Sequence, residues 1–134
     1  MGIFELFGKK KFDAGGAIFV LDLELHPMRL AAHKNDYVDL EINLQNACEA
    51  DVLSSVVITL PKELGFEQSA LSHQKEIRLS TLRPREVRHL KVQVYGTQRT
   101  EPKNYAIHVY AIAHYRDYGY VLNELRKKIE LRAA

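Results

Sequence analysis

The sequence lacks several features that would mark it as a secreted or membrane-spanning protein. It has a single cysteine, Cys48, and no tryptophan in 134 residues, so it cannot form the internal disulfide that small secreted sandwich domains often carry. No apolar run approaches the roughly 18 residues of a membrane span. The apolar residues of the N-terminus precede its lysines, which is the reverse of the order in a signal peptide. These absences predict an intracellular, cytoplasmic protein.

A strong excess of one charge is also missing. The chain has 19 lysines and arginines against 17 acidic residues, and its formal net charge is +2. Dedicated nucleic-acid binders usually show a concentrated basic face, so we expect no nucleic-acid partner. A chain of 15.4 kDa is long enough to bury a core as one domain.

The common motifs of catalysis and metal binding are absent as well. The sequence contains no CxxC, HExxH or GxSxG motif and no glycine-rich phosphate loop. His108 and His114 fall on one face of an expected strand, but six residues of strand span about 20 Å, and ligands of one zinc ion lie within about 4 Å of each other. The other histidines lie on separate segments: His26, His33, His73 and His89. We therefore expect no catalytic residue, metal or cofactor, and no enzyme.

What the sequence does contain is a series of short runs in which apolar and polar residues alternate. This period of two is the pattern of a strand that buries one face. The series predicts an all-β, antiparallel, immunoglobulin-like sandwich of about seven strands over residues 17–134. The connection 61–75 is long enough to cross between the sheets or to hold an extra edge strand. The runs are Ala17–His26, Tyr37–Gln45, Val52–Leu60, Glu76–Ser80, Val87–Tyr95 and Tyr105–Tyr115.

The last segment, residues 120–131, has a mixed pattern. Leu122, Leu125 and Ile129 have helical spacing. Leu125, Ile129 and Leu131 also share strand parity, but Lys127 interrupts the inward face. A tight turn at residues 117–119 would place this segment beside its predecessor, which favours a strand.

A set of turn and core residues over about residues 17–131 follows the order of a known type of domain. It consists of Asn46, then Pro61, Leu64, Gly65 and Phe66, then Leu82, Pro84 and Glu86, then Tyr105, Ile107, Val109 and Ala111. The pattern resembles the immunoglobulin-like sandwich of prokaryotic CARDB and NEW3-type modules. The resemblance implies a binding, spacer or adaptor unit without an active site. Tyr105 stands where such a fold can place a tyrosine that bonds back to the preceding loop.

Acidic residues are predicted to gather on one outer face. If the first two strands pair, they bring together Asp22, Glu24, Asp39 and Glu41. Four acids could bind Ca²⁺ or Mg²⁺. The neighbouring strand, however, offers His89 and Lys91 on the same side, and opposite charges commonly pair across strands. We interpret this face as solvated and charge-paired.

The turn at residues 115–120 is the first candidate interaction surface. Tyrosine and arginine are enriched in binding hot spots because they offer a large contact area with few rotatable bonds. The alternative is that these tyrosines cap the end of the core. The candidate partner-binding residues are Tyr110, Tyr115, Arg116, Tyr118 and Tyr120.

Residues 1–16 are predicted to be a short mobile N-terminal segment, and this amphipathic and basic tail is the second candidate. A membrane surface is one candidate partner, because apolar side chains would enter the headgroup boundary while lysines meet anionic lipid. Docking onto the sandwich or a partner, and disorder, are the alternatives. Sedimentation with anionic liposomes, comparing the full chain with one that starts at Ala17, distinguishes them. The residues concerned are Ile3, Phe4, Leu6, Phe7, Lys9, Lys10 and Lys11.

Together these observations favour a non-catalytic intracellular module that binds a protein partner through the tyrosine-rich hairpin or a sheet edge. A peripheral membrane adaptor is the first alternative, and a metal-dependent binder or enzyme is a less favoured second one. Exposed sheet edges also allow a homodimer.

Overall fold

The computed structural model describes residues 18–134. The predictions on Ile3 to Lys11 therefore lie outside the described residues. Within them the chain is all strand and loop, as predicted, with eight strands in two sheets. No helix in this part of the chain has the length and apolar character to cross a membrane.

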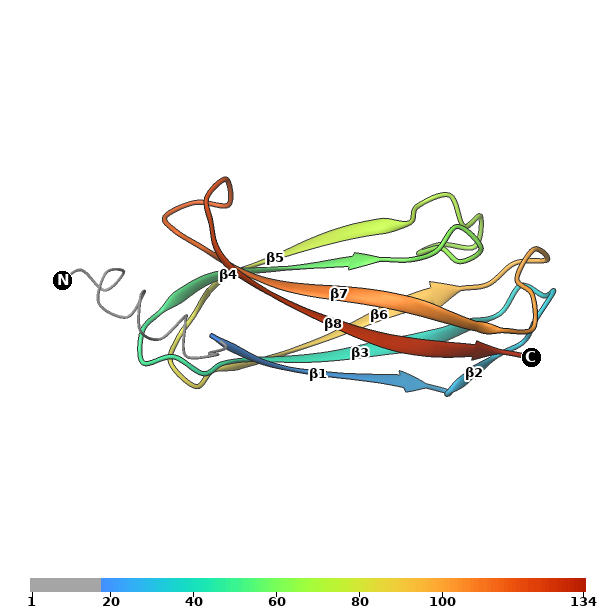
Figure 1. Ribbon diagram of the computed structural model, residues 1–134, viewed down its shortest axis with the longest axis horizontal. Helices are drawn as coiled ribbons and strands as arrows, with labels where there is room; N and C mark the ends of the chain where they lie inside the picture. Colours follow the sequence, from blue (N-terminus) through green and yellow to red (C-terminus); the bar gives the residue numbers. More distant parts are fainter. Residues whose placement is uncertain (1–17) are drawn as a thin grey trace.

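The two sheets face each other as the layers of a sandwich (Figure 1). The three-stranded sheet has the order β1-β3-β6, and the five-stranded sheet has the order β2-β8-β7-β4-β5. The additional strand relative to the prediction is the two-residue β2, which pairs in parallel with the end of β8. The strands are β1 (Phe19–His26), β2 (Arg29–Leu30), β3 (Tyr37–Asn46), β4 (Val52–Thr59), β5 (Gln74–Leu82), β6 (Val87–Tyr95), β7 (Asn104–His114) and β8 (Val121–Ala133).

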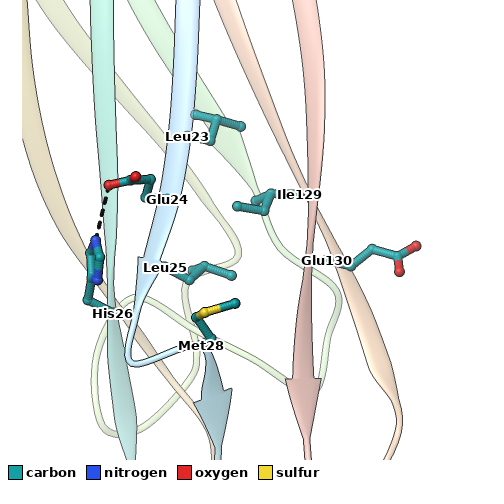
Figure 2. A pocket seen from close by; sticks show the side chains of 7 residues that line it. All are labelled: Leu23, Glu24, Leu25, His26, Met28, Ile129 and Glu130. Carbon is teal, nitrogen blue, oxygen red and sulfur yellow. Dashed lines mark hydrogen bonds and ion pairs between the residues drawn. The ribbon is translucent and has the colours of Figure 1, made fainter.

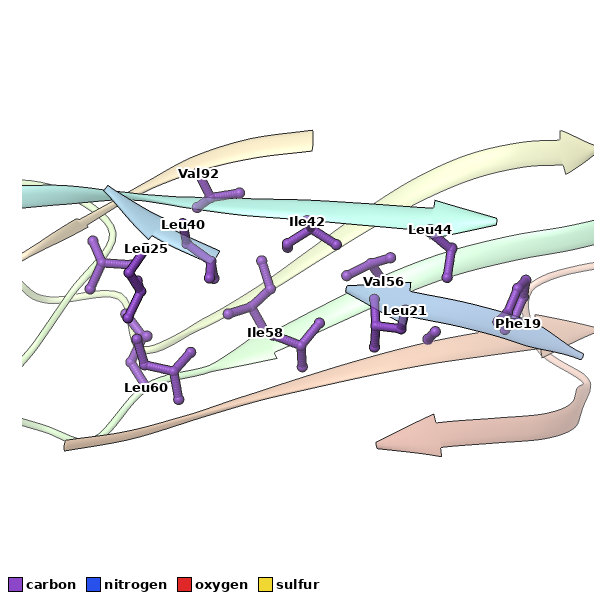
Figure 3. Close-up of a cluster of buried hydrophobic side chains, with 14 of the residues drawn as sticks. Phe19, Leu21, Leu25, Leu40, Ile42, Leu44, Val56, Ile58, Leu60 and Val92 are labelled. Atoms are coloured by element: carbon purple, nitrogen blue, oxygen red, sulfur yellow. The ribbon is translucent and has the colours of Figure 1, made fainter. Parts of the chain in front are cut away.

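Alternation in the sequence becomes alternation in burial. On β3 the side chains of Val38, Leu40, Ile42 and Leu44 are fully buried, while the residues between them are partly exposed. These side chains meet those of β4, such as Ile58, between the two layers (Figure 3). Burial of apolar area at about 25 cal/mol per Å² is what holds such layers together.

The final segment is a strand, β8, as favoured by the turn before it. Its interrupting residue, Lys127, reaches across the open side of the sandwich, where its Nζ donates a hydrogen bond to the carbonyl of Leu21 on β1 at 2.8 Å. The lysine is therefore compatible with a strand because it lies at the edge of the core. An inward-pointing charge at an edge also discourages pairing with other chains.

The connection between β4 and β5 does not cross between the sheets, contrary to one of the expectations for it, because both strands belong to the five-stranded sheet. It forms no extra edge strand either, apart from an isolated bridge between Gly65 and Tyr95 at the end of β6. After β4, the chain next crosses between the sheets at the short turn between β5 and β6.

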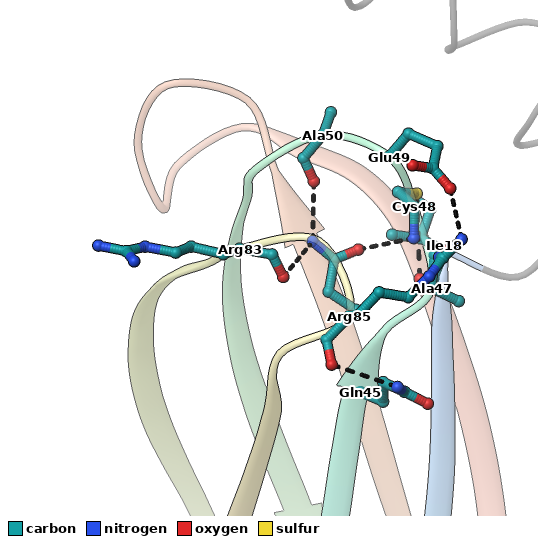
Figure 4. Close-up of polar contacts among 9 residues, drawn as sticks. Ile18, Gln45, Ala47, Cys48, Glu49, Ala50, Arg83 and Arg85 are labelled. Atoms are coloured by element: carbon teal, nitrogen blue, oxygen red, sulfur yellow. Dashed lines mark hydrogen bonds and ion pairs between the residues drawn. The ribbon is translucent and has the colours of Figure 1, made fainter.

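That short turn is held by a buried asparagine, Asn46, and Figure 4 shows Cys48, Ala50 and Arg83 in the two turns around it. The two hydrogens of its side-chain Nδ2 are shared among the carbonyls of Ala50, Leu82 and Arg83, whose oxygens lie at 2.8, 3.0 and 3.1 Å. Its Oδ1 accepts from the backbone N–H of Cys48 at 2.8 Å. One side chain thus ties together the two turns that connect the sheets at this end of the sandwich.

Tyr105 makes the contact predicted for it. Its ring is buried at the start of β7, and its hydroxyl accepts a hydrogen bond from the N–H of Glu101 in the preceding loop at 2.8 Å. This is the tyrosine corner of immunoglobulin-like sandwiches.

Candidate functional site

The β7–β8 hairpin folds over the outer face of the five-stranded sheet. Tyr118 anchors it: the Tyr118 hydroxyl accepts a hydrogen bond from the N–H of Ser80 on β5 at 2.9 Å. The guanidinium of Arg78 lies 4.6 Å from the centre of the Tyr118 ring, and the ring of His114 meets it edge-on at 5.0 Å. These contacts fix the hairpin against β5.

The other predicted residues of this surface are placed differently. Tyr120 is 63% exposed, and the guanidinium of Arg116 stacks over the ring of Tyr115 at 5.0 Å. Tyr110 is half-buried within β7, in register with Val57 and Arg126. The hairpin therefore presents Tyr115, Arg116 and Tyr120 from a fixed base, while Tyr118 belongs to that base.

His114 makes this base sensitive to pH. The side chain is 5% exposed, and its Nε2 lies 2.7 Å from the hydroxyl of Ser55. Burial lowers the pKa of His114, chiefly because desolvation disfavours the imidazolium. The unfolded chain then binds the proton more readily than the folded chain. The contribution of His114 to the free energy of unfolding is therefore complete above pH about 6.5 and falls as the pH decreases towards the lowered pKa.

We expect the His114→Gln variant to lose less stability than the parent between pH 7.5 and pH 5.5. The difference arises because the buried imidazole contributes a slope of up to about 1.4 kcal/mol per pH unit below its ordinary pKa. Urea unfolding at both pH values measures it. Parallel losses in the two proteins would contradict this role, since every other titrating group is shared.

A groove lies at the open side of the sandwich between β1 and β8 (Figure 2). It encloses about 320 Å³, and its apolar lining comes from Leu23, Leu25, Met28 and Ile129. Figure 2 shows these side chains projecting into the space between the two strands. The exposed fraction of Met28 is 78%, so much of this apolar surface faces solvent.

The backbone of β1 is available along the same groove. Within residues 18–134, β1 pairs with β3 on one side only, and the carbonyl of Leu21 faces the other side, where Lys127 binds it. Because hydrogen-bonding directions alternate along an antiparallel strand, Leu23 and Leu25 turn their N–H and C=O groups the same way as Leu21. Lys127 binds only the carbonyl of Leu21, so the outward backbone groups of Leu23 and Leu25 lie beyond the part of β1 that it covers.

The sheet edges at β6 and β5 are better protected than the edge at β1. The free side of β6 is bridged at Tyr95 by Gly65 from the long connection, through backbone hydrogen bonds of 2.7 and 3.0 Å. The β5 edge carries exposed charged side chains at Lys75, Glu76 and Arg78, and charges on an edge strand oppose pairing. Among the described strands, the part of β1 beyond Leu21 borders the apolar groove with a free backbone edge, and the part of β8 before its two-residue pairing with β2 lies on the other side of that groove.

The outer face of the three-stranded sheet holds a second cluster. The register places Glu24 opposite Glu41 and His26 opposite Asp39, so the predicted acidic residues do share one face. Ligand atoms of Glu24, His26 and Glu41 all lie within 4.8 Å of one another. His89 of β6 joins them, with its Nε2 3.8 Å from Glu41 Oε1.

Sequence reasoning placed His89 on the predicted acidic face but did not combine His26 and His89 into one set of ligands. Strand parity is the signal that could have done so, because both residues have the outward parity of that face. The groove was missed for a different reason: Met28 and Ile129 are about 100 positions apart, and only the packing of β8 against β1 joins them.

The comparisons identify the fold. A structure of the native α2-macroglobulin of Escherichia coli matches 89% of this chain with a TM-score of 0.65 and 15% identity. A crystal structure of the same protein, from domain MG7 to the C-terminus, matches 87% with a TM-score of 0.60 and 13% identity. The chain is an immunoglobulin-like β-sandwich. It spans only 7% and 16% of the length of those two chains.

A third neighbour shows how little chemistry the fold decides. AvmM, described as catalysing macrocyclization in alchivemycin A biosynthesis, matches 86% of this chain and 89% of its own length, with a TM-score of 0.53 and 8% identity. Neither a family model nor a curated protein matches the sequence. At these identities the likeness concerns the fold alone, and function must be argued from the site.

Proposed function

We propose that this protein is a non-catalytic interaction module that binds an extended segment of a partner protein along β1. The observation that carries the proposal is the coincidence of an apolar groove with an edge strand whose Leu23 and Leu25 turn their backbone groups outwards. Strand addition of this kind takes its affinity from main-chain hydrogen bonds and its specificity from pockets for alternate side chains.

The groove also suggests the chemistry of the bound segment. A strand added to β1 would extend the three-stranded sheet and set every second side chain over Ile129 and Met28, so those positions should be apolar. Glu24 and Glu130 flank the groove, and both are exposed. Basic residues at the intervening positions would complement them.

The hairpin is the competing surface for the same function. Tyr118 fixes its base, and a fixed loop loses little entropy on binding. It presents an exposed Tyr120 beside Val121, which is 58% exposed. We favour the β1 groove because it offers backbone pairing in addition to apolar area.

The Met28→Glu variant is expected to bind the captured partner with an affinity at least about tenfold lower, equivalent to about 1.4 kcal/mol. The new carboxylate adds to the charges of Glu24 and Glu130 at the mouth of the groove. Leu71→Glu is the matched control, because Leu71 is also 78% exposed but lies in the β4–β5 connection. Both positions tolerate substitution, since exposed sites rarely change stability by more than about 0.5 kcal/mol.

The measurement is quantitative affinity capture from the native organism's lysate, with each variant as bait. Loss of the same protein with Met28→Glu, but not with Leu71→Glu, supports the β1 groove. Equal capture by all baits contradicts it. A third bait, Tyr120→Ser, tests the hairpin, and a loss of capture confined to that variant moves the site there. A second copy of this chain as the partner would appear as concentration-dependent dimerisation in sedimentation, again abolished by Met28→Glu.

The resemblance to CARDB and NEW3-type modules supports a binding or adaptor role. The cytoplasmic location, with or without contact with a membrane surface, is part of the same proposal.

A further inference from the structure

We propose that Glu24, His26, Glu41 and His89 form a binding site for a divalent transition-metal ion of the zinc type. The four residues come from three adjacent strands, β1, β3 and β6, and lie on the outer face of their sheet. This proposal does not rest on the partner-binding groove, but Glu24 and His26 also line that groove.

The ligand atoms of Glu24, His26 and Glu41 lie close enough together for a single ion, since all are within 4.8 Å of one another, and His89 lies beside this group. His26 Nε2 lies 3.2 Å from Glu24 Oε1 and 3.9 Å from Glu41 Oε2. His89 Nε2 lies 3.8 Å from the other oxygen of Glu41. Ligands bound at about 2.0–2.2 Å in a tetrahedron around zinc are about 3.3–3.6 Å apart, so small side-chain adjustments would complete the coordination.

A neighbouring amide orients one of the ligands. His89 Nδ1 donates a hydrogen bond to Oδ1 of Asn43 at 2.7 Å. In the neutral imidazole the proton is then on Nδ1, and the lone pair of Nε2 faces Glu41. A metal ion beside Glu41 would use that lone pair. An outer partner that fixes the tautomer of a histidine is characteristic of metal sites.

The charges on this face favour a cation. Glu24 and Glu41 stand directly opposite each other in the register, and like charges in that arrangement repel. Asp39 adds a third outward carboxylate beside them, whereas Asp22 is paired with Lys127. Lys91 is the outward ammonium on β6, opposite Glu41. A mixed set of imidazole and carboxylate ligands suits zinc-type ions better than Ca²⁺ or Mg²⁺, which take oxygen ligands.

Titration of the tag-free full chain with Zn²⁺ in a calorimeter tests the site. We expect one ion per chain, with binding reduced more than about tenfold in His26→Ala and in His89→Ala. His33→Ala is the matched control, since His33 is exposed on the loop after β2. Asn43→Ala should weaken binding by about 10–100-fold, the usual effect of removing an outer partner of a ligand. Co²⁺ absorption should show the intense visible bands of a tetrahedral ion.

Alternative outcomes overturn the proposal. If the parent binds no stoichiometric Zn²⁺, the four residues are an ion-pair cluster only. If His33→Ala weakens binding as much as His89→Ala, the metal is held by scattered surface histidines. A normal unfolding curve for each variant makes any of these results interpretable.

Discussion

Asn46→Ala is expected to lower the free energy of unfolding by about 3–5 kcal/mol. The substitution removes the side-chain partners of the carbonyls of Ala50 and Leu82 and of the N–H of Cys48, whereas the carbonyl of Arg83 keeps the N–H of Glu86. Asn46 itself is fully buried. Each buried polar group left without a hydrogen bond costs about 1–3 kcal/mol. Backbone rearrangement can recover only part of this, because these groups lie in the turns that join the two sheets.

Urea unfolding of Asn46→Ala beside Asn43→Ala measures the effect. Asn43 is the matched control because it occupies the same strand but faces outwards, with one hydrogen bond to His89. We expect the control to lose less than about 1 kcal/mol. A loss of similar size in both variants would show that the buried amide does not hold the two turns.

Gly65→Ala is the second substitution with a large expected effect, a loss of about 2–3 kcal/mol. A Cβ at Gly65 would lie 2.2 Å from the Cα of Ala70, a backbone atom. Ala70 is itself buried. The added methyl must therefore break either the turn that brings Ala70 back or the bridge from Gly65 to Tyr95. Overpacking of this kind typically costs about 1–3 kcal/mol.

Thermal or urea unfolding again supplies the measurement, with Gly119→Ala as the control. A Cβ at Gly119 meets only Asp117 Oδ1, a movable side-chain atom at 3.1 Å, so we expect that variant to change stability by less than about 1 kcal/mol. If Gly65→Ala were as stable as the parent, the close approach to Ala70 would have to be wrong.

The strands were predictable because burial on one face imposes a period of two on the sequence. Val38, Leu40, Ile42 and Leu44 show this most clearly. β8 was harder to predict because Lys127 occupies an inward position. Lys127 is compatible with this position because it donates a hydrogen bond to the carbonyl of Leu21, 106 residues away. No local sequence pattern can reveal such a contact.

The functional surfaces depend on contacts that a single sequence conceals. The tyrosines of the hairpin were equivalent as residues, yet the fold uses Tyr118 to anchor the turn on Ser80 and leaves Tyr120 exposed. The acidic outer face followed from parity alone. Parity also put His89 on this face, but the closeness of His26 and His89 to Glu41 required the register of β1, β3 and β6.

Residue-specific amide hydrogen exchange along β1 tests the central claim most directly, namely that this strand receives a partner. The N–H groups of Asp22 and Glu24 face β3, whereas those of Leu23 and Leu25 face the groove. We predict slow exchange for the first pair and fast exchange for the second in the free protein, followed by slow exchange of all four when the captured partner is bound. Leu23 and Leu25 amides that are already protected in the free protein, or that stay unprotected at saturation, would contradict the account.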